Sequence, residues 1–131
     1  MGDETKKTQG KTILIVEDEP ALCEALRDKL LREGFTVLAA KDGKEGLEIA
    51  LIDHPDLILL DIIMPVMDGM TMLNKLRADP WGKGALVIIL TNLSDAKDPL
   101  VLFPHRSLDY LVKSDWKIED LTAKVKERLG R

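Results

Sequence analysis

The chain has one cysteine, no apolar run long enough for a membrane span, and no secretory signal at its start. A single cysteine excludes a framework of internal disulfide bonds and is typical of a reducing compartment, so we expect a cytoplasmic protein. Every apolar run falls short of the roughly 20 residues that cross a bilayer, and we therefore expect no membrane partner. Because Cys23 lies among leucines at helical spacing, we interpret it as a buried structural thiol rather than a nucleophile.

A basic surface and a glycine-rich phosphate loop are also missing. The net charge is −4, with 19 lysines and arginines against 23 acidic residues, so no excess of positive charge suggests direct nucleic-acid binding. The first apolar run opens onto acids and Pro20, which argues against a flavin or dinucleotide protein. At 131 residues the chain is long enough for one domain. We expect a mobile polar tail over 1–10 and one folded domain over 11–131, with no output domain after it.

Short apolar segments alternate with segments of helical periodicity along the folded part of the chain. The strand-like segments are 11–16, 35–40, 57–61, 86–90 and 110–112. Helical spacing of apolar residues marks the segments 20–33, 45–51, 69–78 and 116–129. Alternation of this kind is typical of βαβ units, so the sequence predicts an α/β fold with a parallel sheet and helices on both faces.

Polar residues stand at the ends of four of these strands. Glu17 and Asp18 follow the first, Asp61 ends the third, Thr91 follows the fourth and Lys113 follows the fifth. Because the carboxyl ends of parallel strands meet at one edge of a sheet, we expect these side chains to form a charged crevice there. Carboxylate oxygens at this density suit a hard divalent cation, and we expect Mg²⁺. A lysine beside the ion can pair with a phosphoryl oxygen.

Four motifs make the chain resemble the response-regulator receiver domain, the CheY-like phosphoacceptor of two-component signalling. They are Ile-Val-Glu-Asp-Glu-Pro after the first strand, Leu-Leu-Asp-Ile-Ile-Met-Pro-Val-Met-Asp-Gly around Asp61, Leu-Thr after the fourth strand and Asp-Tyr-Leu-Val-Lys-Ser before the last helix. The match covers nearly all of residues 11–129. It implies a flavodoxin-like, doubly wound sheet of five parallel strands in the order 2-1-3-4-5, with five helices.

The resemblance also implies a function and roles for individual residues. Asp61 would accept a phosphoryl group from a histidine kinase or phosphotransfer protein, with Mg²⁺ bound, and relay the signal by a conformational switch. The receiver of that signal would be a downstream protein partner, or a second copy of the chain through self-association. Such a domain is no enzyme beyond catalysing its own phosphorylation and dephosphorylation. By position, the implied roles are metal acids for Glu17, Asp18 and Asp61, a metal-binding backbone carbonyl for Ile63, a switch hydroxyl for Thr91, a switch aromatic for Tyr110 and a phosphate partner for Lys113.

Two other functions compete with this interpretation. A pseudo-receiver would act as a binding module without phosphorylation, but the complete set of acids, hydroxyl and lysine argues against it. An aspartyl-phosphate phosphatase of the haloacid-dehalogenase type would place a second acid two residues after its nucleophile, where this chain has Ile63. We interpret Asp68 and Gly69 as a turn and the start of a helix, and assign them no chemistry.

The connection from the fourth to the fifth strand departs from the family pattern. Over 95–108 the family carries its fourth helix, but here Pro104 lacks an N–H and clashes with the preceding turn. We therefore predict a short or broken fourth helix, with at least one of Val101, Leu102 and Phe103 exposed in the monomer or buried by a partner. Ser114 follows Lys113 where proline is common in the family, which leaves open whether that peptide bond is cis.

Overall fold

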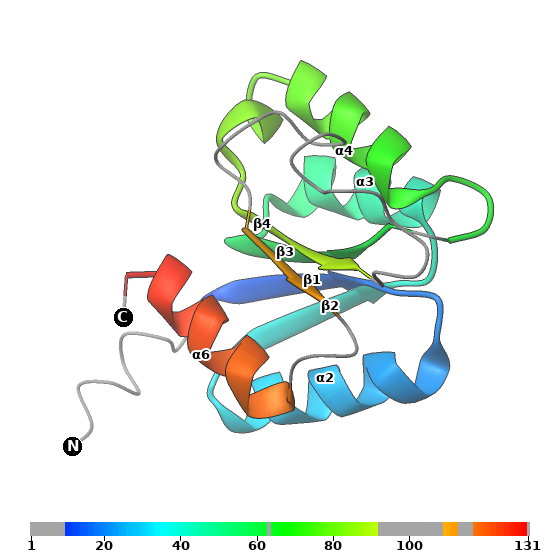
Figure 1. The fold of residues 1–131 in the computed structure, drawn as a ribbon. Helices are drawn as coiled ribbons and strands as arrows, with labels where there is room; N and C mark the ends of the chain where they lie inside the picture. The colour runs from blue at the N-terminus through cyan, green and yellow to red at the C-terminus, as the bar shows by residue number, and fades with distance from the viewer. Residues whose placement is uncertain (1–9, 63, 92–108, 113–116, 131) are drawn as a thin grey trace.

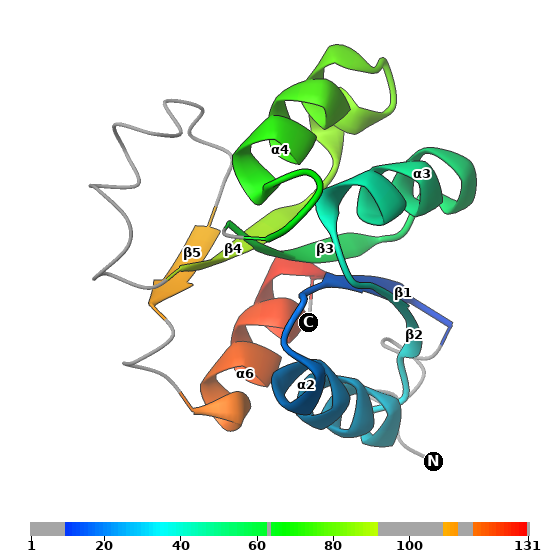
Figure 2. The same cartoon turned by 90° about the vertical axis from the view of Figure 1, so that its right-hand side faces the viewer.

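A parallel sheet with helices on both faces forms the body of the molecule (Figures 1 and 2). The computed structural model describes residues 10–62, 64–91, 109–112 and 117–130. Its strands are β1 (Thr12–Val16), β2 (Thr36–Ala40), β3 (Leu57–Asp61), β4 (Val87–Thr91) and β5 (Asp109–Val112). Its helices are α2 (Pro20–Arg32), α3 (Gly43–Asp53), α4 (Gly69–Ala78), the short 3₁₀ helix η1 (Gly82–Gly84) and α6 (Ile118–Arg128).

The sheet has the predicted topology. Its strand order is β2-β1-β3-β4-β5, and every neighbouring pair is parallel. Helices α3 and α4 cover one face, while α2 and α6 cover the other (Figure 1). The doubly wound α/β fold is therefore confirmed. The predicted fourth helix over 95–108, with its exposed apolar residues, and the Lys113–Ser114 peptide lie outside the described residues.

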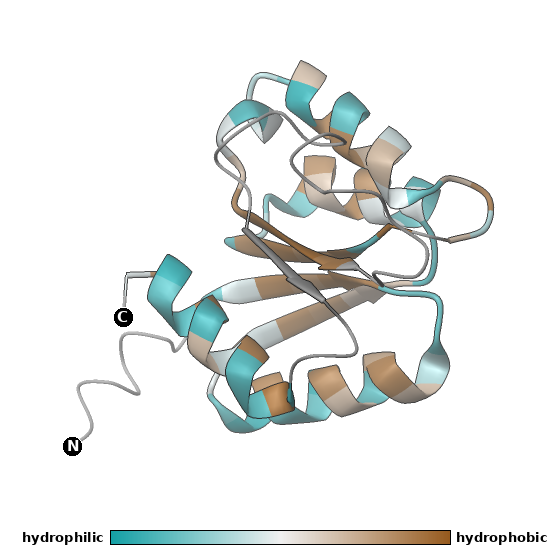
Figure 3. Ribbon diagram, viewed as in Figure 1, coloured by the Kyte–Doolittle hydropathy of each residue, from teal (hydrophilic) through white to brown (hydrophobic). Residues whose placement is uncertain are grey.

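The central strands are apolar because both of their faces are covered. Along β3, alternate residues pack on opposite sides: Ile58 and Leu60 face α3 and α4, whereas Leu57 and Leu59 face α2 and α6. All four are fully buried. In Figure 3 the middle parts of β1, β3 and β4 are brown, while teal segments appear on the helices, most of all on α6. Continuous apolar runs of this kind are expected of parallel strands buried on both faces.

The ends of the helices follow local chemistry. Pro20 occupies the first turn of α2, and Gly34 with a φ of +95° follows its end, in agreement with the predicted segment 20–33. Helix α3 begins at Gly43, two residues before the predicted 45, because the side chain of Asp42 accepts a hydrogen bond from the Glu45 N–H at 2.8 Å. The carboxylate of Glu45 in turn accepts the Lys41 N–H at 2.9 Å, which makes the start of α3 a well-bonded turn.

Cys23, His54 and Trp81 have packing roles. Cys23, which we expected to be a buried structural thiol, is partly buried against the apolar cluster under α2. Burial, followed by the nearby charges of Glu17 and Glu24, raises the pKa of this thiol, which makes it a poor nucleophile. The rings of His54 and Trp81 stack with their centroids 4.3 Å apart and so pack the end of α3 against the connection before η1.

Arg77 ties the end of α4 to the beginning of β4. Its Nη1 donates to the carbonyl oxygens of Gly82 at 2.7 Å and Ala85 at 2.8 Å. Burial lowers the pKa of Arg77, but a guanidinium remains charged at any physiological pH. The connection into β4 is therefore held by charge-assisted hydrogen bonds.

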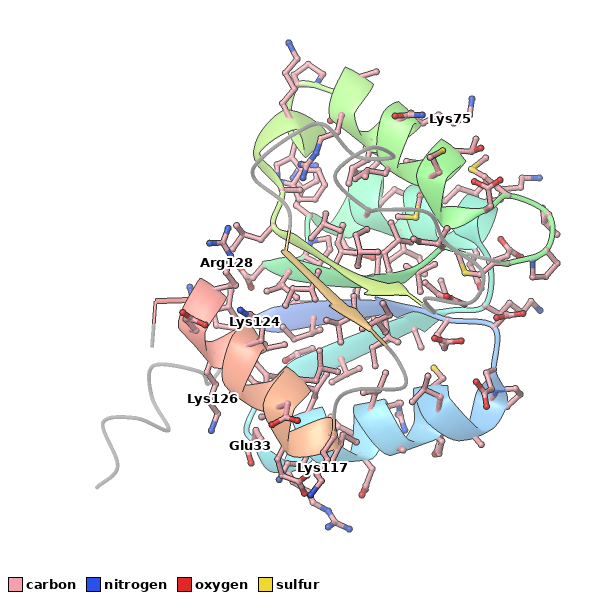
Figure 4. The ribbon with its side chains drawn as sticks, in the orientation of Figure 1. Glu33, Lys75, Lys117, Lys124, Lys126 and Arg128 are labelled. Carbon is pink, nitrogen blue, oxygen red and sulfur yellow. The ribbon has the colours of Figure 1, made fainter. Side chains whose placement is uncertain are left out.

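An ion pair links the end of α2 to α6 (Figure 4). Glu33, just after α2, pairs with Lys126 of α6 and with Lys29, whose Nζ lies 3.4 Å from the Glu33 carboxylate. The hydrogen bond from Lys126 is the main reason that the pKa of Glu33 is lowered, and Lys29 adds to it. The pair of Glu33 with Lys126 therefore connects α2 and α6 at the surface, outside the apolar core.

We predict that Glu33→Gln destabilises the fold at neutral pH and that this loss disappears in acid. Because the pKa of Glu33 is lower in the folded protein, its carboxylate stabilises the fold above the unfolded pKa, and this contribution is lost as the pH falls through the folded pKa. The partners are partly exposed, so we expect a loss of about 0.2–1 kcal/mol near pH 7. Thermal unfolding of wild type and Glu33→Gln from neutral pH into acid measures this difference in stability.

Glu127→Gln is the matched control, since it breaks a more exposed ion pair with Lys124 inside α6. A difference between wild type and Glu33→Gln that stays constant from neutral pH into acid would contradict the prediction.

Candidate functional site

Three carboxylates meet at the carboxyl edge of the sheet. Oxygen atoms of Glu17, Asp18 and Asp61 all lie within 4.8 Å of one another. The parallel pairing of β1 with β3 brings this about, because Val16 lies beside Leu60 and the next residues leave the two strands at the same edge. Glu17 and Asp61 are only 2% and 6% exposed, whereas Asp18 is exposed. The cluster thus joins two buried acids to one that water reaches.

The backbone fixes the direction of the two buried acids. The Glu17 N–H donates to the carbonyl oxygen of Ala40 at 3.0 Å, which extends the β1–β2 pairing by one residue. One Glu17 carboxylate oxygen accepts the Glu19 N–H at 3.2 Å. Asp61 is the last residue of β3 and pairs in register with Leu90 of β4. Both carboxylates are therefore held on the ends of strands instead of on free loops.

The donor set fits a hard divalent metal ion. Carboxylate oxygens are the ligands that Mg²⁺ prefers, and Mg²⁺ usually takes one or two of them while it keeps several waters. A cluster of three acids with one exposed member offers both the oxygens and the access for water. Ile63, whose carbonyl the resemblance implies as a further ligand, lies outside the described residues.

The other strand ends lie at the same edge. Thr91 ends β4 and pairs in register with Val112, the last residue of β5. The neighbouring pair is Asp61 with Leu90, so the backbone of Thr91 leaves the sheet one residue beyond that of Asp61. The description of Thr91 and of Tyr110 in β5 covers their backbone and not their side chains, and Lys113 is outside it. The roles given to these three residues remain predictions.

The loop between β3 and α4 closes tightly against Asp61. The Gly69 N–H donates to the carbonyl oxygen of Ile62 at 2.7 Å, and the side chain of Asp68 accepts the Thr71 N–H at 2.8 Å as the cap of α4. A Cβ atom on Gly69 would overlap the carbonyl oxygen of Asp61. Gly69 therefore supports the backbone of Asp61, a role that the sequence analysis missed. The Asp-Gly pair that begins α4 was its only local signal.

The same loop contains a strained turn. The Met67 N–H donates to the carbonyl oxygen of Pro65 at 2.7 Å, and Val66 between them has a φ of +67°. An i to i+2 hydrogen bond with positive φ at the central residue defines the rarer, strained kind of γ-turn. A β-branched residue is ill suited to positive φ, and Val66 is also 78% exposed. The exposed side chain of Val66 therefore makes little packing contact that could compensate for the strain of its backbone.

A comparison with known protein families identifies the family of this chain. Residues 13–126 match the model of a family described as the response regulator receiver domain. The chain belongs to the response regulator receiver family. This receiver domain is 35% identical over 119 residues to the DNA-binding dual master transcriptional regulator RpaA of Synechocystis, covering 91% of this chain and 49% of that protein. The chain spans about half the length of the curated relatives it matches.

Solved structures give the same family. A response regulator from Chloroflexus aurantiacus superposes with a TM-score of 0.83 at 30% identity, covering 94% of this receiver domain and 100% of that chain. The receiver domain of the sensor histidine kinase PA1611 from Pseudomonas aeruginosa has a magnesium ion coordinated in its active site cleft. It matches with a TM-score of 0.78 at 30% identity, covering 93% of this receiver domain and 99% of that chain.

Within the described part of the chain, no helix is both long and apolar enough to cross a bilayer.

We predict that Asp18→Asn raises the melting temperature of this receiver domain in a chelator. Two unit charges less than 5 Å apart in a solvated site repel by roughly 1 kcal/mol, and the exposed Asp18 lies within this range of two other acids. Removing its charge relieves that repulsion. Mg²⁺ should then stabilise the variant less than wild type, for which a hundredfold excess over the dissociation constant contributes about 2.7 kcal/mol.

Glu48→Gln on the exposed side of α3 is the control, because it removes an acid outside the cluster. If Asp18→Asn melts below wild type in the chelator, repulsion among the acids does not dominate the metal-free site.

We predict that Val66→Asn stabilises the receiver domain. Asparagine tolerates positive φ far better than valine, and the exposed side chain of Val66 contributes little packing, so about 1 kcal/mol of backbone strain should be relieved. Urea unfolding measures the change. Ile52→Asn serves as the control, since Ile52 is 79% exposed on ordinary helical backbone. A free energy of unfolding for Val66→Asn at or below that of wild type would show that the turn is not strained.

Proposed function

We propose that this receiver domain accepts a phosphoryl group on Asp61 with Mg²⁺ bound, and relays the signal by a conformational switch. The observation that supports this proposal is the buried Asp61 carboxylate, held on a strand end within 4.8 Å of two other acids. Phosphoryl transfer requires an oxygen nucleophile held in line and positive charge to offset the equatorial oxygens. The acid cluster offers the nucleophile and the place for the metal ion.

The reaction needs few groups beyond those at the edge of the sheet. A carboxylate oxygen of Asp61 forms a bond to phosphorus as the donor's N–P bond breaks, and that electron pair remains on the donor's imidazole nitrogen. The product is an acyl phosphate on Asp61. Glu17 and Asp18 would hold the ion with Asp61 and the Ile63 carbonyl. Bound Mg²⁺ supplies charge that stabilises the phosphoryl oxygens.

The later strands complete the proposal. Lys113 would pair with a phosphoryl oxygen, and Thr91 would donate a hydrogen bond to another oxygen once the acyl phosphate has formed. That bond would favour one of two arrangements of the chain after β4, and Tyr110 would change place with it. The domain would then catalyse only its own phosphorylation and dephosphorylation. The three acids would have no role of this kind in a pseudo-receiver, and we do not favour that alternative.

Partners follow from this chemistry. The phosphoryl donor would be a histidine kinase or a phosphotransfer protein, and the output would be a protein contact or self-association. The description of RpaA as DNA-binding belongs to a protein about twice as long as this chain. For the receiver domain itself we propose an output through protein surfaces.

We predict that Asp61 is the sole phosphoacceptor. Incubation with acetyl phosphate and Mg²⁺ should add one phosphoryl group to the wild-type chain, as measured by intact mass, and none to Asp61→Asn. Asp53→Asn changes an exposed aspartate outside the site and should behave as wild type. A full phosphoryl increment on Asp61→Asn would overturn the assignment, and no increment on wild type would favour the pseudo-receiver.

A further inference from the structure

The loop that follows Asp61 is anchored at two places. At the base of the loop, where its two ends meet, the Gly69 N–H donates to the Ile62 carbonyl oxygen at 2.7 Å. At its side, the carbonyl oxygen of Met67 accepts the Gly43 N–H at 2.9 Å. The hydrogen bond at the base alone would let the loop rotate about Asp61. The second bond, from Gly43 to Met67, restricts this rotation.

The side anchor needs a glycine for steric reasons. A Cβ atom at Gly43 would overlap the Met67 carbonyl oxygen, approach the Met67 carbonyl carbon to 2.9 Å and approach the Asp68 carbonyl oxygen to 3.1 Å. These neighbours are backbone atoms and have no rotamer to change. Gly43 has helical backbone in the first turn of α3, where alanine would ordinarily be preferred. Close approach to the loop, and not a special φ, therefore explains the glycine.

The turn that carries Gly43 also holds the other side of the site. Ala40, at the end of β2, accepts the Glu17 N–H at 3.0 Å. Three residues later, Gly43 donates to the loop after Asp61. Asp42 between them fixes the start of α3 through the Glu45 N–H at 2.8 Å. One short segment, residues 40–43, therefore sets the position of Glu17 relative to the phosphoacceptor loop, although it contributes no acid to the cluster.

We infer that Gly43 is a positioning residue of the phosphoryl-accepting site. Its contact with Met67 holds the β3–α4 loop, and with it the end of β3, in the place where Asp61 and Glu17 can share a metal ion. The inference rests on the proposed function for its link to phosphorylation. Its claim about loop position and Mg²⁺ binding can be measured without any phosphoryl transfer.

The test compares Mg²⁺ binding by Gly43→Ala with that of three other variants, using amide chemical shifts in titrations. Changes beside metal ligands typically weaken affinity by 10-fold or more, so we expect the dissociation constant of Gly43→Ala to rise roughly tenfold. The amide signals of Met67, Asp68 and Gly69 should shift even before Mg²⁺ is added. Phosphorylation by acetyl phosphate at saturating Mg²⁺ should recover part of the wild-type rate, because excess ion compensates for weaker binding.

Two variants are controls for glycine content and for stability. Gly84→Ala adds a Cβ atom where no atom lies within 4 Å, and should leave Mg²⁺ affinity unchanged. Val125→Ala removes buried packing in α6, on the other face of the sheet, and should lower the melting temperature without weakening Mg²⁺ binding.

Asp42→Ala keeps the inference testable if Gly43→Ala does not fold. It removes the cap of α3 without adding an atom against the loop, and should weaken Mg²⁺ binding by a smaller factor in the same direction. Wild-type affinity in Gly43→Ala would overturn the inference, as would an equal loss in Val125→Ala. If Gly43→Ala does not fold, wild-type affinity in Asp42→Ala overturns it. Should wild type bind Mg²⁺ as expected but not accept phosphate on Asp61, the proposed function fails while the positioning role stands.

Discussion

The parallel pairing of β1 with β3 is the interaction on which the acidic site depends. Val16 lies beside Leu60, so the residues that follow leave two adjacent strands at the same edge and in the same direction. Antiparallel pairing of the same segments would send Glu17 and Asp61 to opposite edges of the sheet. The cost of gathering three carboxylates within 4.8 Å is met by the buried apolar strands behind them. Stability and site are thus separated along each strand, with packing in its middle and charge at its end.

Helices α3 and α4 contact the acidic site mainly through their first turns. Helix α3 begins with a bonded turn that contacts the loop after Asp61, and α4 begins with a glycine packed on the Asp61 backbone. Both contacts are made by backbone atoms at sites where a side chain would intrude. The positions of the acids at the carboxyl edge of the sheet therefore depend on close backbone contacts as well as on the residue types. Functional groups in general need rigid neighbours to hold them in place.

The sequence predicted most of the fold and the acids of the site, for reasons that can be named. Apolar runs and the alternation of strands with helices are local patterns, and Pro20 and Gly34 mark the ends of α2 by their own backbone preferences. Strand order came from the resemblance, because periodicity does not tell which strands are neighbours. The role of Gly43 could not be predicted, because its contact with Met67 joins segments that are distant in the sequence. The positive φ of Val66 could not be predicted either, because it opposes the local backbone preference of valine.

The origin of the acids in the chain has a consequence for the proposed read-out. Glu17 and Asp18 follow β1 and Asp61 ends β3, and they are supported by residues 40–43 and by the loop between β3 and α4. Thr91 and Tyr110 belong to β4 and β5, which join the sheet on the far side of β3. Because β5 pairs with β4 and not with β3, a substitution at Tyr110 would act on the proposed read-out without touching a strand that carries one of the acids.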